Sequence, residues 1–81
     1  MKSTLHKLKI LPCYFGPVAQ GVKTFEIRYN DRDYHVGDIL KLCEWSATAG
    51  YTGRWVNCEI TFTTNYAQRD NYIVMAIKLL N

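Results

Sequence analysis

Hydrophobic and polar residues alternate along much of this 81-residue chain, and the alternation predicts a fold made largely of strands. The first such segment covers residues 5–11 and suits an opening strand. A strand directs successive side chains to opposite faces. The segment therefore has one face with Leu5, Lys7 and Lys9 and a second face with His6, Leu8 and Ile10.

Residues 12–20 interrupt the alternation and predict a short helix. Pro12 suits a first-turn position, hydrophobic residues follow at spacings of three and four, and Gly21 is a favourable stop. Pro17 cannot donate a hydrogen bond inside a helix. We therefore expect the helix either to begin after Pro12 or to bend near Pro17.

The segment after this helix, residues 21–28 with the sequence GVKTFEIR, predicts a short strand that carries a polar site. Alternation directs Phe25 and Ile27 toward the core and leaves Thr24, Glu26 and Arg28 together on the other face. With Lys23 beside them, these groups could bind an anionic or hydrogen-bonding ligand, or arrange proton transfer. An ordinary strand with a solvated polar face is the alternative interpretation.

Three further strands are predicted at residues 38–45, 55–64 and 72–80, separated by turn-rich segments. Their expected inward-facing residues are Leu40 and Leu42, then Val56, Cys58, Ile60 and Phe62, and finally Ile73, Met75 and Ile77. Five or six strands in so short a chain can remove their sheet edges by curling. We predict one domain, residues 1–81, of the mainly β (α+β) class: a small barrel of five to six strands with a helix at one end.

Composition and charge narrow the function classes. The chain is 48% hydrophobic and 21% charged, as in soluble globular proteins, and it contains no apolar run long enough for a membrane helix. Its start lacks the continuous apolar block of a signal peptide, so a cytoplasmic location is expected. The net charge of +3 permits nucleic-acid binding without requiring it.

The three cysteines, Cys13, Cys43 and Cys58, indicate neither a disulfide framework nor a metal site. They form no CxxC pair and have no histidine at metal-ligand spacing. We interpret them as reduced thiols, mostly in the core or an interface, and expect no metal and no cofactor.

Residues 6–38, HKLKILPCYFGPVAQGVKTFEIRYNDRDYHVGD, resemble the ASCH domains of the PUA-like superfamily, in particular the small stand-alone bacterial and phage type. The similarity continues through ILKLCEW, GYTGR and YIVMAI and so covers nearly the whole chain. The resemblance implies a five- or six-stranded barrel with a helix beside it. It also implies a cleft between helix and barrel, lined by the GxKTxEIR strand, that binds RNA or modified nucleosides.

For a binding module of this kind, seven residues are the predicted ligand contacts: His6, Lys23, Thr24, Glu26, Arg28, Asp38 and Tyr51. Arg28 and Lys23 can engage phosphate, and Glu26 can accept a hydrogen bond from an exocyclic amine or a ribose hydroxyl. Stacking on a base is assigned to Tyr51, Tyr14 or Trp45, and further positive surface to Lys7, Lys9 and Lys41. The alternative for Arg28 and Asp38 is that they pair with each other and leave nothing for a ligand.

The resemblance also suggests an alternative function, hydrolysis of the acetyl group of acetylated cytidine. ASCH amidohydrolases use a lysine on this strand, a threonine three residues later and a distant glutamate in a helical insertion. Lys23 matches the lysine, Glu26 occupies the threonine position, Thr24 lies next to the lysine, and residues 65–71 are too short for the insertion. In this alternative Lys23 and Glu26 are the catalytic groups, with Glu26 acting as a base on a bound water. A barrel that binds a protein partner through an edge strand is a third possibility, and no sequence feature identifies such a partner.

Overall fold

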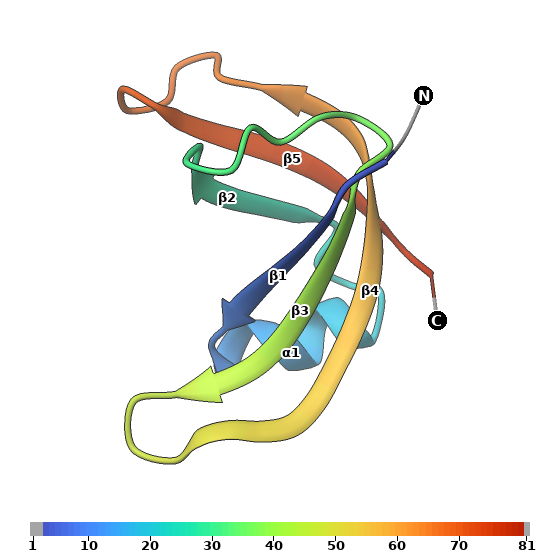
Figure 1. Cartoon of the computed structure of the whole chain (residues 1–81), viewed down its shortest axis with the longest axis vertical. Helices are drawn as coiled ribbons and strands as arrows, with labels where there is room; N and C mark the ends of the chain where they lie inside the picture. The colour runs from blue at the N-terminus through green and yellow to red at the C-terminus, as the bar shows by residue number, and fades with distance from the viewer. Residues whose placement is uncertain (1–2, 81) are drawn as a thin grey trace.

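A single curled sheet with a short helix beside it makes up the computed structural model, which describes residues 3–80 (Figure 1). The strands follow the order β1-β3-β4-β5-β2 across the sheet. β1 runs parallel to β3, and the other three pairings are antiparallel. The elements are β1 (Leu5–Ile10), α1 (Pro12–Ala19), β2 (Phe25–Tyr29), β3 (Ile39–Ser46), β4 (Gly50–Thr64) and β5 (Tyr72–Leu79).

The sheet curls because its longest strand, β4, pairs with β3 along its first part and with β5 along its second part. The pairing register shifts between Cys43 and Trp45 on β3 and again between Ile60 and Phe62 on β4. Irregularities of this kind bend a strand and increase its twist. The result is a half-barrel of five strands, which confirms the predicted fold class.

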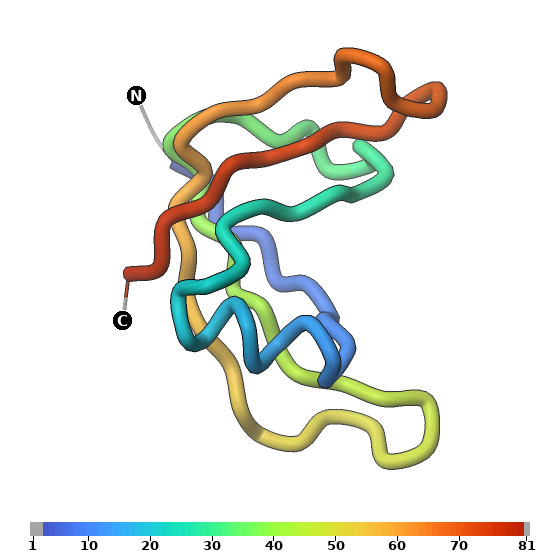
Figure 2. The backbone as a smooth tube through the Cα atoms, turned by 180° about the vertical axis from the view of Figure 1, so that it is seen from behind, coloured from blue at the N-terminus to red at the C-terminus, as the bar shows by residue number. Residues whose placement is uncertain are grey.

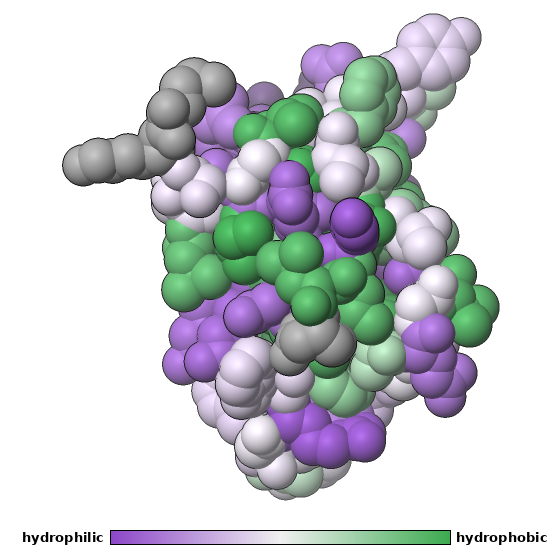
Figure 3. All heavy atoms as spheres, turned by 90° about the vertical axis from the view of Figure 1, so that its right-hand side faces the viewer, coloured by the Kyte–Doolittle hydropathy of each residue, from purple (hydrophilic) through white to green (hydrophobic). Residues whose placement is uncertain are grey.

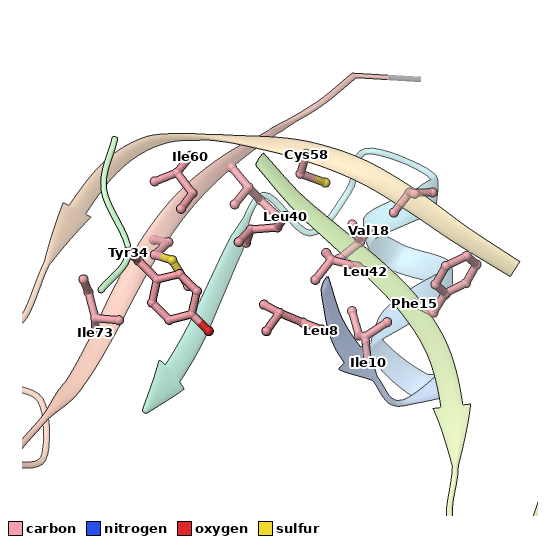
Figure 4. Packing of buried hydrophobic residues seen from close by; sticks show 13 residues of the cluster. Leu8, Ile10, Phe15, Val18, Tyr34, Leu40, Leu42, Cys58, Ile60 and Ile73 are labelled. Atoms are coloured by element: carbon pink, nitrogen blue, oxygen red, sulfur yellow. The ribbon is translucent and has the colours of Figure 1, made fainter. Parts of the chain in front are cut away.

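The core lies on the concave side of the half-barrel, where α1 packs against β3 (Figure 4). Phe15 and Val18 are the buried residues of the helix. Pro17 lies inside the helix, and its carbonyl accepts hydrogen bonds from the N–H groups of Val22 and Lys23. Gly21 follows with a φ of 75°, a left-handed conformation that favours glycine and lets the chain turn toward β2. Seen from behind, the chain leaves α1 and continues directly into β2 (Figure 2).

The inward-facing residues predicted for β3 and β5 are confirmed, whereas two predictions of orientation are wrong. Phe25 and Ile27 of β2 are about half exposed, and Glu26 between them is buried, so β2 presents its polar face inward. Phe62 is 64% exposed because the register shift after Ile60 turns it outward. Hydrophobic side chains therefore reach the surface, and Figure 3 shows a band of them across one side of the molecule.

A buried pair, His6 and Asp38, joins the starts of β1 and β3. His6 Nε2 lies 2.8 Å from Asp38 Oδ2, and the same carboxylate accepts hydrogen bonds from the N–H groups of Thr4 and His35, both at 3.0 Å. Burial alone would raise the pKa of Asp38, but these hydrogen bonds outweigh it and hold the pKa below its ordinary value of 3.8. The edge of the Tyr34 ring packs against His6 with a centroid distance of 4.8 Å.

We predict that Asp38→Asn lowers the free energy of unfolding at neutral pH by about 1–3 kcal/mol, because it weakens several hydrogen bonds to a buried carboxylate. A depressed folded-state pKa stabilises the fold above the unfolded-state pKa, and this stabilisation is lost as the pH falls through the folded-state value. Urea titrations from about pH 7 to about pH 2 should therefore show the gap between wild type and Asp38→Asn closing in acid. A gap that is constant with pH, or one shared by exposed Asp70→Asn, would contradict this role.

Candidate functional site

The half-barrel is open between its two edge strands, β1 and β2, and a cleft of about 470 Å³ lies at this opening. Its walls come from the end of β1, from Leu11 and Tyr14 at the beginning of α1, and from residues 23–28. Because the chain passes from β1 into α1 and from α1 toward β2, three consecutive elements border the same space. This position, beside the helix, agrees with the cleft that the sequence led us to expect.

Glu26 lies on the cleft wall as a buried carboxylate held by two cations. Its Oε1 accepts a hydrogen bond from Lys23 Nζ at 2.7 Å, and its Oε2 accepts one from Arg28 Nε at 2.9 Å. Only about 5% of the Glu26 side chain is exposed, whereas the two cations are partly exposed. Two cations around one carboxylate leave the group with a formal charge of +1. The arrangement therefore favours an anionic ligand that approaches from solvent.

Arg28 also bridges the opening, because its Nη2 donates to the carbonyl oxygen of Lys9 on β1 at 2.8 Å. Arg32, in the loop after β2, donates in the same way to the carbonyl of Lys7 at 3.0 Å. In the described part of the chain, these side chains take the place of a neighbouring strand for the free edge of β1. Sequence reasoning did not identify Arg32, since a turn residue carries no pattern that reveals its contact with a distant strand.

Aromatic rings complete the cleft wall on the side of α1. Lys23 Nζ lies 5.5 Å from the ring centroid of Tyr14 and 4.5 Å from that of Phe25. Both rings are about half exposed. Tyr14, which was one of three candidates for base stacking, is the one that lines this cleft. The cleft thus combines cations, an acceptor carboxylate and exposed ring surface.

The structure brings together three of the seven predicted ligand contacts, Lys23, Glu26 and Arg28. Thr24 is exposed and borders a separate, smaller hollow of about 250 Å³. His6 and Asp38 bind each other at the start of β1, and Tyr51 lies exposed near Lys7. Pairing between Arg28 and Asp38, the alternative interpretation, is wrong, because Arg28 pairs with Glu26 and Asp38 with His6.

Glu44 and Arg54 form a second charged group, where the β3–β4 hairpin meets α1. Arg54 donates to both carboxylate oxygens of Glu44 at 3.0 Å, and Thr52 Oγ1 donates to Oε1 at 2.7 Å. Hydrogen bonds from Arg54 and Thr52 hold the pKa of Glu44 below its ordinary value. The Arg54 guanidinium also lies 4.9 Å from the ring centroid of Phe15. This group fastens the hairpin to the helix.

Cys58, the most deeply buried cysteine, is a poor nucleophile. Burial, together with the nearby negative charge of Glu26, raises its pKa to about 11, so the thiol is protonated at neutral pH. Over residues 3–80, no three His, Cys, Asp or Glu side chains are grouped closely enough to hold a metal ion. The same residues include no helix long and apolar enough to cross a membrane.

Fold and site together define a small α+β half-barrel domain with a charged cleft beside its helix. Residues 5–77 match the family described as Domain of unknown function (DUF3850), and the chain belongs to that family. It is also similar to a protein of Escherichia phage P2 described as "Uncharacterized 12.9 kDa protein in GpA 3'region". The two are 36% identical over 76 residues, which make up 93% of this chain and 69% of the phage protein. This relationship is consistent with a small domain of the bacterial and phage type, as expected from the sequence.

We predict that Glu26→Gln lowers the free energy of unfolding by about 2 kcal/mol, because a neutral amide replaces a buried carboxylate that bonds two cations. Glu59→Gln is the matched control, since Glu59 is only partly buried on β4 and should change stability by less than about 0.5 kcal/mol. Urea denaturation followed by tryptophan fluorescence measures both. Equal losses of stability in the two variants would contradict the prediction, because the ion pairs of Glu26 would then contribute no more than a partly buried surface carboxylate.

Proposed function

We propose that this domain binds RNA or a nucleotide in the cleft between α1 and the half-barrel. The observation that carries the proposal is the convergence of Lys23, Glu26 and Arg28 in an open cleft of about 470 Å³. A nucleotide presents an anionic phosphate, hydroxyl and amine donors and an aromatic base. The cleft offers cations, an acceptor and ring surface for these groups in turn.

Lys23 and Arg28 keep donors available for a phosphate. Arg28 uses Nε for Glu26 and Nη2 for Lys9, and a guanidinium carries five N–H groups in total. Lys23 donates to Glu26 and to the carbonyl of Phe25, and an ammonium has three donors. Glu26 is the acceptor for a ribose hydroxyl or an exocyclic amine, and Tyr14 is the stacking surface for the base.

The same features support assignment to the ASCH domains of the PUA-like superfamily, which forms part of the proposal. A half-barrel with a helix beside a cleft is the arrangement that the resemblance implies. The 21–28 segment, which carries much of that resemblance, supplies the three charged residues of the cleft. This position connects the resemblance to the proposed binding site.

Amidohydrolase activity on an acetylated nucleoside is the second candidate, and the 2.7 Å contact between Lys23 Nζ and Glu26 Oε1 is the observation in its favour. Both Glu26 oxygens, however, already accept hydrogen bonds from cations. Each oxygen keeps a second lone pair, so a bound water or a ligand hydroxyl can still donate a hydrogen bond to Glu26. In this chain, however, Glu26 takes the place of the threonine of ASCH amidohydrolases, and residues 65–71 are too short for the helical insertion that carries their glutamate. Binding is therefore better supported than catalysis.

We predict that Arg28→Ala weakens binding of a ribonucleoside monophosphate at least tenfold, because a charged donor to the phosphate is lost. Isothermal titration calorimetry at low salt, with the four monophosphates and their nucleosides, separates the phosphate contribution from the base contribution. Arg69→Ala, in the exposed β4–β5 turn, is the matched control.

Because Arg28 also bridges β1 and β2, circular dichroism must show that the variant is folded, and Lys23→Ala gives an independent test of the cleft. No affinity of the wild-type protein for any of the eight compounds or for a short RNA would overturn the proposed function. So would equal losses in Arg28→Ala and Arg69→Ala.

The catalytic alternative is tested by incubating the protein with N4-acetylcytidine and measuring acetate release. The expected rate equals that of buffer, because the threonine and the distant glutamate of ASCH amidohydrolases have no counterpart in this chain. Release that is faster than buffer and is lost in Lys23→Ala would instead establish the amidohydrolase.

A further inference from the structure

The convex side of β1, β3 and β4 carries lysines interleaved with aromatic rings. We call the six residues the Lys–aromatic face: Lys7, Lys9, Lys41, Trp45, Tyr51 and Trp55. Lys9 Nζ and Lys41 Nζ each lie 4.4 Å from a ring centroid, of Trp45 and Trp55 respectively. Lys7 Nζ lies 5.7 Å from the ring centroid of Tyr51.

A shallow hollow of about 170 Å³ lies within this face, bordered by Tyr51 and Trp55 of β4 and by Lys7 and Lys41. Cys43 also lines it, on the strand between them, directly opposite Trp55 on β4 and Lys9 on β1. The thiol side chain of Cys43 is much smaller than the surrounding lysines and rings, which leaves space above it. Tyr51 is 54% exposed and Trp55 is 45% exposed, so their rings are accessible from solvent.

The hollow is positively charged, which favours an anionic ligand. Among the described residues that line it, three are basic and none is acidic. Arg54 is neutralised by Glu44, so Lys7 and Lys41 supply the net positive charge. Cations beside accessible rings are the combination that binds single-stranded nucleic acid, where phosphates meet lysines and bases stack on aromatic side chains.

We propose that the Lys–aromatic face is a second contact surface for single-stranded nucleic acid, with a base in the hollow against Tyr51 or Trp55 and phosphates on Lys7 and Lys41. An exposed contact between a lysine and a ring is weak, so the ammonium can move to a phosphate while a base takes its place over the ring. This inference deepens the proposed function and rests on it for the class of ligand. With two contact surfaces, the expected ligand is a single-stranded nucleic acid rather than a free nucleotide.

Lys9 connects the two surfaces. Its carbonyl oxygen binds Arg28 at the cleft, and its side chain lies over Trp45 on the Lys–aromatic face. A single-stranded nucleic acid with one nucleotide bound in the cleft therefore only has to pass over β1 to reach the Lys–aromatic face. The cleft contact is made at the free edge of β1, and the Lys9 side chain on the same strand belongs to the Lys–aromatic face.

The test measures fluorescence anisotropy of labelled ten-nucleotide oligouridine and oligothymidine over a range of salt concentrations. Tyr51→Ala/Trp55→Ala should weaken binding about tenfold or more with little change in salt dependence, because stacking is lost. Lys7→Gln/Lys41→Gln should reduce the slope of log affinity against log salt by about 1.4, since each phosphate contact on a single strand contributes roughly 0.7. A preference for one oligomer over the other then identifies RNA or DNA as the ligand.

Tyr66→Ala and Lys78→Gln are matched controls, because both residues are exposed and lie outside the hollow. If the double aromatic variant does not fold, Tyr51→Ala alone gives the test. The inference is overturned if the controls lose as much affinity as the double variants. It is also overturned if inorganic polyphosphate competes as well as the oligonucleotides and the aromatic variants bind normally, which would indicate simple polyanion attraction.

The proposed binding site in the cleft and the proposed Lys–aromatic face can be tested separately. Mononucleotide binding that depends on Arg28, combined with oligonucleotides that bind no more tightly than mononucleotides, would eliminate the face and leave the cleft. Oligonucleotide binding that depends on Tyr51 and Trp55, without any mononucleotide affinity, would eliminate the cleft and support the face.

Discussion

Side-chain hydrogen bonds across the gap between β1 and β2 are the contacts on which both the fold and the cleft depend. In the described part of the chain, the two edge strands do not pair, and Arg28 and Arg32 reach across to carbonyl groups of β1. A strand in this place would have closed the barrel and filled the opening. Guanidinium groups satisfy the free carbonyls and still leave space, so the half-barrel keeps an accessible cleft.

The need to bridge the gap to β1 also explains why β2 directs its polar side chains inward and its hydrophobic side chains outward. Arg28 must face inward to reach β1, and alternation along the strand then directs Glu26 inward as well. A buried carboxylate needs compensating partners, which Arg28 and Lys23 provide. Phe25 and Ile27 are thereby placed on the outside. The polar face of β2 therefore lies inside the half-barrel, and its hydrophobic face is partly exposed to solvent.

Much of the fold could be predicted from the sequence because most of its elements obey local rules. Proline and glycine mark the two ends of α1, and the alternation along β1, β3 and β5 identifies the buried face of each strand. Phe62 was assigned to the core because the register shift after Ile60 leaves no mark in the alternation. Phe25 and Ile27 were misplaced for a different reason, since burial of Glu26 depends on contacts that a pattern of hydrophobic residues cannot show.

The candidate site was predictable only in part. Lys23, Glu26 and Arg28 lie within six residues of one another, so the segment that carries them could be recognised from its sequence. His6 and Asp38, by contrast, are 32 positions apart and meet only because β1 pairs with β3. The Lys–aromatic face also requires three strands to be placed side by side. Its lysines and rings could be named beforehand, but their interleaving could not.

The strand order has a consequence for how the domain folds. β3, β4 and β5 follow one another in the chain and pair through hairpins, whereas β1 and β2 pair with strands that are distant in sequence. Closing long loops costs more chain entropy and slows folding, so the central three strands have the advantage in forming first. The walls of the cleft are then the last parts of the domain to assemble and the first to separate when it unfolds.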